Sequence, residues 1–185
     1  MPSFTRTALF FTLALSAAAA TSGAKEPRLE NDRFAFALPD LNGQIVSSSD
    51  ARFEGKVLFV TIWGTWCPPC LSEVPAFIDL QRRYGDDGLV IVAIAFEKVT
   101  PASARVEHLR KFARDRDVNY LVLDGGATDE FSDALPMVKD VQGLPIEIIV
   151  DRSGAVVECR NGYGYRKKWA RKLEKTLEEL LAQER

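Results

Sequence analysis

Two stretches of the chain are apolar almost throughout and rich in β-branched and aromatic residues. They cover residues 57–63 and 89–96. Such runs are typical of strands that are buried on both faces of a sheet. Shorter apolar segments predict three further strands, at 118–123, 146–150 and 155–159, of which the last two are joined by a hairpin turn.

Apolar positions between these strands recur at helical spacing. A helix from about residue 68 to residue 84 is predicted by a stripe of five apolar residues, Leu71, Val74, Phe77, Ile78 and Leu80. The same reasoning predicts helices at about 102–117 and 166–182, a short helix within 129–140 interrupted near Pro136, and a loop around Gly125 and Gly126. Strands that alternate with helices, followed by a hairpin and a final helix, predict an α/β fold with a mixed sheet covered on both faces.

The beginning of the chain has a different composition. Arg6 precedes a stretch without charges from Thr7 to Ala24, and small residues at its end suit cleavage by a signal peptidase. We expect residues 1–24 to be a secretory signal peptide. An uncleaved membrane anchor is the alternative, because the stretch approaches the length needed to cross a bilayer. Residues 25–56 are rich in turns and predict a short strand or hairpin that leads into the domain.

Length and charge restrict the classes of function. At 185 residues the chain is long enough for one domain, which we assign to residues 25–185. Its content of 46% apolar and 27% charged residues is that of a globular protein with a buried core. With a net charge of -2 there is no bulk positive field to attract phosphate backbones, so nucleic acid is not an expected partner.

The strongest chemical signal is Cys67-Pro68-Pro69-Cys70, which stands between a buried strand and the first helix. If Cys67 is the N-cap, both prolines fall in the first turn, where backbone N–H groups have no helical acceptor. The N–H of Cys70 then points at the Cys67 sulfur. Together with the helix dipole it favours the thiolate, the species that attacks disulfides. We predict Cys67 as the nucleophile and Cys70 as the more shielded resolving thiol that closes a redox disulfide.

The pair has other possible uses. A permanent structural disulfide would gain little, because so short a loop removes little entropy from the unfolded chain. A closed zinc site needs four ligands, and the single histidine, His108, is expected to be a solvated helix residue. We predict no metal and no other cofactor, with a copper site built from the pair and Cys159 or His108 as the alternative. Cys159 itself is expected to be a buried thiol that packs as a small apolar residue, or else to pair with a partner.

The residues around the motif resemble a known family. Trp66 to Cys70, followed by Leu71-Ser72-Glu73-Val74-Pro75, is similar to the active-site segment of the thioredoxin superfamily, and in particular to TlpA/ResA-like exported thiol:disulfide oxidoreductases. About 75 residues later, Val141 to Ile146 and the turn that follows at 150–154 resemble the family's cis-proline loop and hairpin. The resemblance covers roughly residues 34–182. It implies a thioredoxin-like fold with an N-terminal strand or hairpin extension and a central insert.

The resemblance also implies roles for single residues. Pro145 is expected to be cis and to lie against the cysteine pair, where Leu144 offers backbone groups to an incoming peptide. Trp66 is expected to shield the sulfurs. Glu73 follows Cys70 by three residues and so lies on the same side of a helix. The resemblance implies that Glu73 relays the proton of the Cys70 thiol.

Two positions depart from the family pattern, and Pro75 departs from an ordinary helix. Thr61 stands where thioredoxins proper carry a buried acid below the motif, which moves proton handling toward Glu73. Ile146 replaces the threonine that usually follows the cis-proline, which puts substrate hydrogen bonding at that position in doubt. Pro75 lies inside the first helix and is expected to kink it.

These observations predict an exported, monomeric enzyme of the periplasm or cell envelope that exchanges electrons with disulfides of other proteins. Its expected partners are protein disulfide substrates and an upstream electron donor in the membrane or envelope. The resemblance implies a reductant, with cytochrome c maturation as a candidate role. A thiol oxidant and a copper-binding carrier are the alternatives. A peroxidase is disfavoured, because a cysteine pair at a helix start suits disulfide exchange better than a lone peroxidatic cysteine does.

Overall fold

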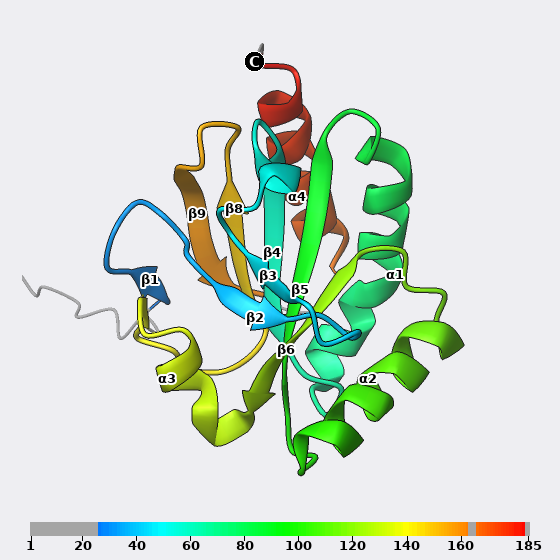
Figure 1. Cartoon of the computed structure of the whole chain (residues 1–185). Coiled ribbons are helices and arrows are strands. Elements are labelled where there is room, and N and C mark those ends of the chain that lie inside the picture. Colours follow the sequence, from blue (N-terminus) through cyan, green and yellow to red (C-terminus); the bar gives the residue numbers. More distant parts are fainter. Residues whose placement is uncertain (1–25, 163–165, 184–185) are drawn as a thin grey trace, which may run out of the picture.

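The computed structural model describes residues 26–162 and 166–183, which are organised around a five-stranded sheet (Figure 1). The strand order is β6-β5-β4-β8-β9. Its members are β4 (Val57–Trp63), β5 (Leu89–Glu97), β6 (Leu121–Ala127), β8 (Ile146–Val150) and β9 (Val156–Asn161). β4, β5 and β6 run parallel, whereas β8 is antiparallel to both β4 and β9. The predicted mixed sheet is confirmed, and its central strand leads directly into the cysteine motif.

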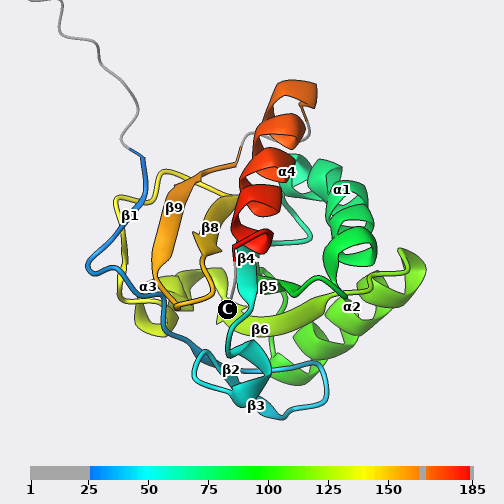
Figure 2. The same cartoon turned by 90° about the horizontal axis from the view of Figure 1, so that it is seen from above.

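Different elements cover the two faces of this sheet. Three helices pack on one face: α1 (Pro68–Tyr84), α2 (Ala102–Asp115) and α4 (Lys167–Leu181). The other face is covered by the hairpin β2 (Ala37–Pro39) and β3 (Ile45–Ser47), by η1 (Ala51–Phe53) and by α3 (Phe131–Ala134). Seen from above, α1 and α4 lie across the strands from the hairpin (Figure 2). The remaining elements are β1 (Arg28–Leu29), which pairs with β7 (Val138–Lys139), and η2 (Thr128–Glu130).

Alternation along β4 explains why the sheet needs a cover on both sides. Leu58, Val60 and Ile62 pack toward the hairpin, whereas Val57 and Phe59 pack toward α1 and α4. All five are buried. Burying a side chain of this size contributes about 1.5–3 kcal/mol relative to leaving it exposed. β4 is therefore held from both sides and is a rigid base for the start of α1.

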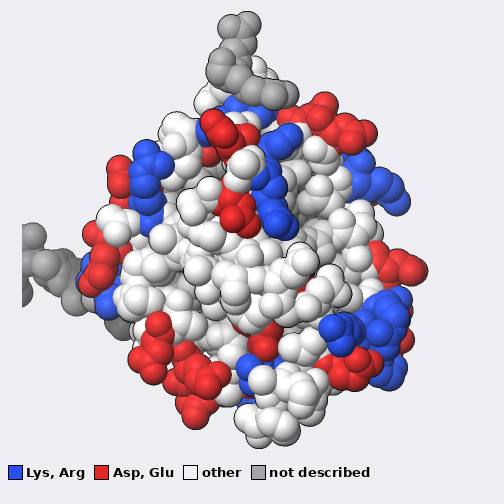
Figure 3. All heavy atoms as spheres, viewed as in Figure 1, with Lys and Arg blue, Asp and Glu red and all other residues white. Residues whose placement is uncertain are grey.

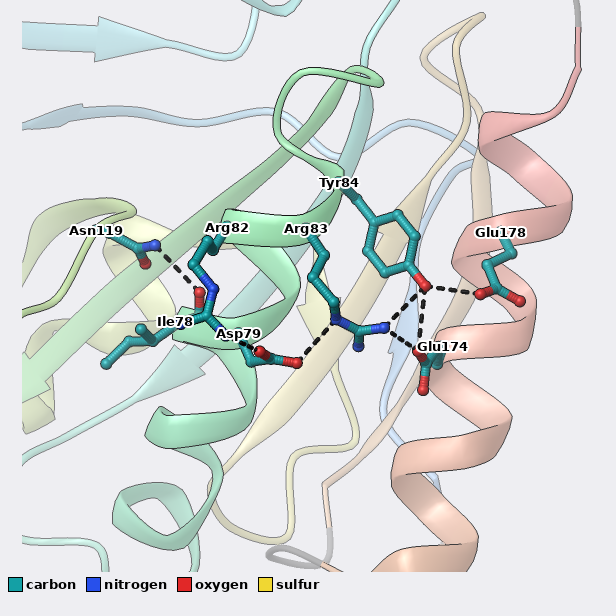
Figure 4. Close-up of polar contacts among 8 residues, drawn as sticks. All are labelled: Ile78, Asp79, Arg82, Arg83, Tyr84, Asn119, Glu174 and Glu178. Carbon is teal, nitrogen blue, oxygen red and sulfur yellow. Dashed lines mark hydrogen bonds and ion pairs between the residues drawn. The ribbon is translucent and has the colours of Figure 1, made fainter.

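A polar network joins the end of α1 to α4 (Figure 4). The hydroxyl of Tyr84 donates to Glu178 at 2.6 Å and lies 3.1 Å from a carboxylate oxygen of Glu174. Arg83 forms an ion pair with the same Glu174. Burial, followed by the hydrogen bonds to the two carboxylates, raises the pKa of Tyr84. The phenol therefore stays a donor, and the network holds α4 against the helix that carries the motif.

One predicted loop is a strand. Gly125 and Gly126 belong to β6, which begins at Leu121 and extends to Ala127. A Cβ atom on Gly125 would lie 2.8 Å from the ring of Phe96, and Gly126 has a φ of 113° where the register against β5 shifts. The prediction was wrong because two adjacent glycines usually mark a turn. Here Gly125 allows the ring of Phe96 to approach the backbone.

The N-terminal predictions fall partly beyond this structure. The signal peptide and the alternative membrane anchor were assigned to residues 1–24, which lie outside the described residues. Within 26–162 and 166–183, no helix is long and apolar enough to cross a membrane. On the face shown in Figure 3, charged side chains of both signs lie mainly around the rim of a largely uncharged centre. That face carries no continuous field of one sign.

Candidate active site

Cys67 is the N-cap of α1, as predicted. Its backbone is extended, with φ -102° and ψ 102°, and its sulfur accepts a hydrogen bond of 3.3 Å from the N–H of Cys70. Pro68 and Pro69 occupy the first two helical positions. A missing N–H costs nothing there, because those groups have no partner inside the helix. The N–H of Cys70 is thus the donor that this helix start offers to the sulfur.

The two cysteines form a disulfide. The sulfur atoms are 2.09 Å apart and the Cα atoms 5.3 Å apart. Both residues are buried, Cys67 at 3% exposure and Cys70 at 1%. Cys70 is the more shielded of the two, as expected, but the difference is small because Trp63 and Leu144 pack in the same cluster as both cysteines. In the oxidised protein both cysteines are therefore covered by these side chains.

The loop before β8 lies against the disulfide. The Leu144–Pro145 peptide bond is cis, as the family resemblance implied. The Cys67 sulfur lies 3.6 Å from the carbonyl oxygen of Leu144. On the other side of the loop, the N–H of Gly162 donates to the carbonyl oxygen of Pro145 at 2.8 Å. Antiparallel pairing of β4 with β8 brings this loop to the end of β4 where the motif begins.

Two acidic residues are buried on this side of the sheet. Glu73 of α1 has no exposed surface, and Glu147 of β8 is 1% exposed. Glu147 is the register partner of Thr61 on β4, and its Oε2 accepts from Arg160 at 2.7 Å and from the indole N–H of Trp169 at 3.0 Å. Burial raises the pKa of Glu147, although Arg160 and Trp169 act in the opposite direction. Sequence reasoning identified Glu73 and missed Glu147, whose signal is a charged residue in the middle of an apolar strand.

A second polar network fixes the residues just before the motif. Buried Glu97, at the end of β5, accepts from the N–H of Thr65 at 2.7 Å and from its hydroxyl at 2.8 Å. His108 of α2 lies 2.8 Å from the same hydroxyl. Because the hydroxyl gives its one proton to Glu97, the Nε2 atom of His108 is the donor in that contact. His108 is exposed, as predicted. It also contacts Thr65 just before the motif, a contact that sequence reasoning did not predict.

Trp66 is anchored by its indole. The N–H of the ring donates to the carbonyl oxygen of Phe96 at 2.8 Å, and the amine of Lys98 lies 4.2 Å from the ring centroid. The side chain remains 39% exposed. A large apolar surface fixed at one end and open at the other is suited to contact a peptide.

The third cysteine is only partly buried. Cys159 lies on β9, and burial, followed by the charge of Glu26, raises the pKa of its thiol to about 11. The expectation of a buried thiol was therefore too strong, because β9 is the last strand of the sheet. Among the described residues, no group of three or more His, Cys, Asp and Glu side chains is arranged to hold a metal ion.

The fold and this site together define a class. A mixed sheet, a cysteine pair at the start of the first long helix and a cis-proline loop against it are the features of a thioredoxin-like thiol:disulfide oxidoreductase. The AhpC/TSA family matches residues 31–159, and the chain belongs to that family.

Relatives of known name agree with this class. The thioredoxin-like protein YneN of Bacillus subtilis is 30% identical over 141 residues, which is 75% of each chain. The thiol-disulfide oxidoreductase ResA of the same organism is 33% identical over 129 residues, which is 69% of this chain and 64% of that protein.

Solved structures agree on the fold. A thiol:disulfide interchange protein of the thioredoxin family from Chlorobium tepidum has a TM-score of 0.64 at 24% identity, and the match covers 84% of this chain and 98% of that chain. A DsbF homologue from Corynebacterium diphtheriae has a TM-score of 0.64 at 19% identity, covering 86% and 96%. The predicted thioredoxin-like fold is confirmed.

Proposed function

We propose that the enzyme is an exported reductant of protein disulfides that works in the periplasm or cell envelope. The observation that carries this proposal is the Cys67 sulfur at a helix N-terminus, hydrogen-bonded to the N–H of Cys70 and 3.6 Å from the carbonyl oxygen of Leu144. An envelope or membrane protein would return electrons to the pair after each cycle. Apocytochrome c is the candidate substrate, and the working form is a monomer.

The first step is attack by Cys67. In the reduced enzyme the helix dipole and the N–H of Cys70 stabilise the thiolate at this position. The thiolate attacks one sulfur of the substrate disulfide, which gives a mixed disulfide and releases the other substrate sulfur as a thiolate. The carbonyl of Leu144 and the loop at Pro145 hold the substrate backbone, and Trp66 packs against its side chains.

The second step is resolution by Cys70. Its thiol loses a proton, its sulfur attacks Cys67, and the substrate leaves reduced while the enzyme disulfide forms. Glu73, which is buried on α1, accepts the proton of Cys70. A carboxylate near the thiol is needed because no solvent reaches a residue that is 1% exposed.

The number of donors to the sulfur supports the reducing direction in this proposal. Strong stabilisation of the thiolate makes a disulfide oxidising. Pro68 and Pro69 have no N–H, so the helix start offers the sulfur one hydrogen bond, from Cys70. Weak stabilisation of the reduced form favours a low reduction potential and therefore a reductant.

Two measurements test the proposal. Equilibration with glutathione should give a reduction potential near that of thioredoxin, about -270 mV, and a value above about -180 mV would identify an oxidant instead. Expression of the full chain with Cys70→Ser should trap mixed disulfides with envelope proteins, including apocytochrome c. The matched control is Cys67→Ser with Cys70→Ser. Equal capture by both variants would refute attack by Cys67.

A further inference from the structure

Two buried acids, Glu73 and Glu147, approach each other beside Gly162. A Cβ atom on Gly162 would lie 3.1 Å from Oε1 of Glu73 and 3.1 Å from Oε1 of Glu147. The two Oε1 atoms are therefore no more than 6.2 Å apart, which is twice 3.1 Å. The same Cβ atom would lie 2.5 Å from Cγ of Pro145. The two carboxyl groups therefore meet next to the cis-proline loop.

One carboxylate oxygen of Glu147 has no hydrogen bond from the described residues. Oε2 accepts from Arg160 and Trp169, but Oε1 is buried and has no hydrogen-bond partner among the described residues. The hydroxyl of Thr61, on the neighbouring strand at the paired position, is buried without a partner as well. Buried polar atoms without partners are rare and call for an explanation. A proton held at this place would turn one carboxyl oxygen into a donor.

The cation beside Glu147 is shared with a second carboxylate. Among the residues that the structure describes, Arg160 of β9 is the cation bonded to Glu147. Arg160 also pairs with Glu158, which in turn pairs with Lys172 of α4. Two neutral side chains also lie beside Glu147. Trp169 of α4 donates a hydrogen bond to it, and Thr61 is its register partner on β4. Two ionised carboxylates this close in a buried setting repel each other, so such pairs keep one proton to a higher pH than a single acid does.

We propose that Glu73 and Glu147 form a coupled carboxyl pair, in which Glu147 is a positioning residue that strengthens Glu73 as the base for the Cys70 thiol. This inference rests on the proposed function and adds a residue to it. When Cys70 attacks, its proton passes to the pair, the bond between the two enzyme sulfurs forms, and the bond to the substrate sulfur breaks. The departing thiolate takes up a proton. The two cysteines are oxidised by two electrons and the substrate disulfide is reduced.

The test separates the two chemical steps. Reduced full-length protein, with Cys159→Ser in every variant, is mixed rapidly with dithiobis(nitrobenzoate). This aromatic disulfide releases one coloured thiolate when Cys67 attacks and a second when Cys70 resolves. Glu147→Gln should move the pH midpoint of the second phase down by about two units, because like charges at this distance interact that strongly at an effective dielectric of about 20. The midpoint of the first phase should not move.

Controls distinguish coupling from a structural effect. Glu147→Asp keeps the charge, so its second midpoint should lie close to that of the wild-type protein. Glu158→Gln removes a carboxylate from the same Arg160 and should shift the midpoint by less than about 0.3 unit. The inference is overturned if Glu147→Gln leaves the second midpoint in place or moves both midpoints equally.

A measurement on the wild-type protein covers the case in which Glu147→Gln does not fold. Infrared spectra should show a protonated carboxyl band that persists above about pH 6, since an isolated Glu titrates at about 4.3. Loss of every such band by pH 6 overturns the inference. If the wild-type protein shows no second phase at all, resolution by Cys70 fails, and with it the proposed function.

Discussion

The segment before the cysteines depends on a single buried carboxylate. Glu97 accepts two hydrogen bonds from Thr65, one from the backbone N–H at 2.7 Å and one from the hydroxyl at 2.8 Å. In Glu97→Gln, the amide oxygen can accept one of these bonds, and the NH2 group cannot accept the other. A hydrogen bond to a charged group contributes about 1.5–3 kcal/mol. Removing the buried charge offsets part of this, so we expect a loss of about 1–2 kcal/mol in the free energy of unfolding.

Urea unfolding of the oxidised protein measures this loss as a lower midpoint at an unchanged slope. The matched control is Glu107→Gln, since Glu107 lies on α2 with 62% of its side chain exposed. It should change stability by less than about 0.5 kcal/mol. A double-mutant cycle with Thr65→Val isolates the bond to the hydroxyl. A loss below about 0.5 kcal/mol in Glu97→Gln, or no coupling in the cycle, would refute the reasoning that this carboxylate fixes the motif.

Three further predictions concern other parts of the molecule. Gly162→Ala should destabilise the protein and slow disulfide exchange, because its Cβ would lie 2.5 Å from Cγ of Pro145; urea unfolding and exchange rates measure both. Arg105→Met should cost about 3–5 kcal/mol in unfolding free energy, since it leaves Asp124 buried and without its cation. Cys159, with a pKa of about 11, should be alkylated by iodoacetamide at pH 8 about a hundredfold more slowly than in the unfolded chain. Because the pKa of this thiol is raised, the rate of alkylation of Cys159 should increase as the pH rises toward 11.

Each of these has an outcome that contradicts it. A Gly162→Ala protein with wild-type stability and rate would mean that the loop shifts freely. An Arg105→Met protein that loses less than about 1 kcal/mol would mean that the ion pair is not isolated from water. Alkylation of Cys159 at pH 8 at the rate of a free thiol would show that its surroundings do not suppress the thiolate.

Much of the fold follows from local signals in the chain. The strand Val57–Trp63, the helix Pro68–Tyr84 and the strand Ile146–Val150 were predicted with the bounds that the structure shows. Each has an uninterrupted apolar run or a clear capping pattern, so the local preference and the tertiary packing agree. β6 was misplaced because Gly125 accommodates the ring of Phe96 on the neighbouring strand. A contact between residues so far apart in the chain cannot be recognised from the local sequence.

For the site too, local features were predictable and contacts between distant elements were not. The cysteine pair and its capping geometry depend on four consecutive residues, so their arrangement was predictable. Glu147, Glu97 and His108 gain their meaning from register and from packing between elements that are far apart in the chain. Sequence spacing does not show which strands or helices pack together when they are far apart in the chain, and these residues were therefore missed or assigned to solvent.

The contact between the Cys67 sulfur and the carbonyl of Leu144 joins residues 77 positions apart in the chain. During synthesis both thiols emerge well before the segment that later covers them. For that interval the nascent chain carries a bare dithiol, with no strand β8 to shape its surroundings. A ribosome-bound fragment ending before residue 144 should therefore react with any disulfide it meets, and selectivity begins only when the C-terminal half has joined the sheet.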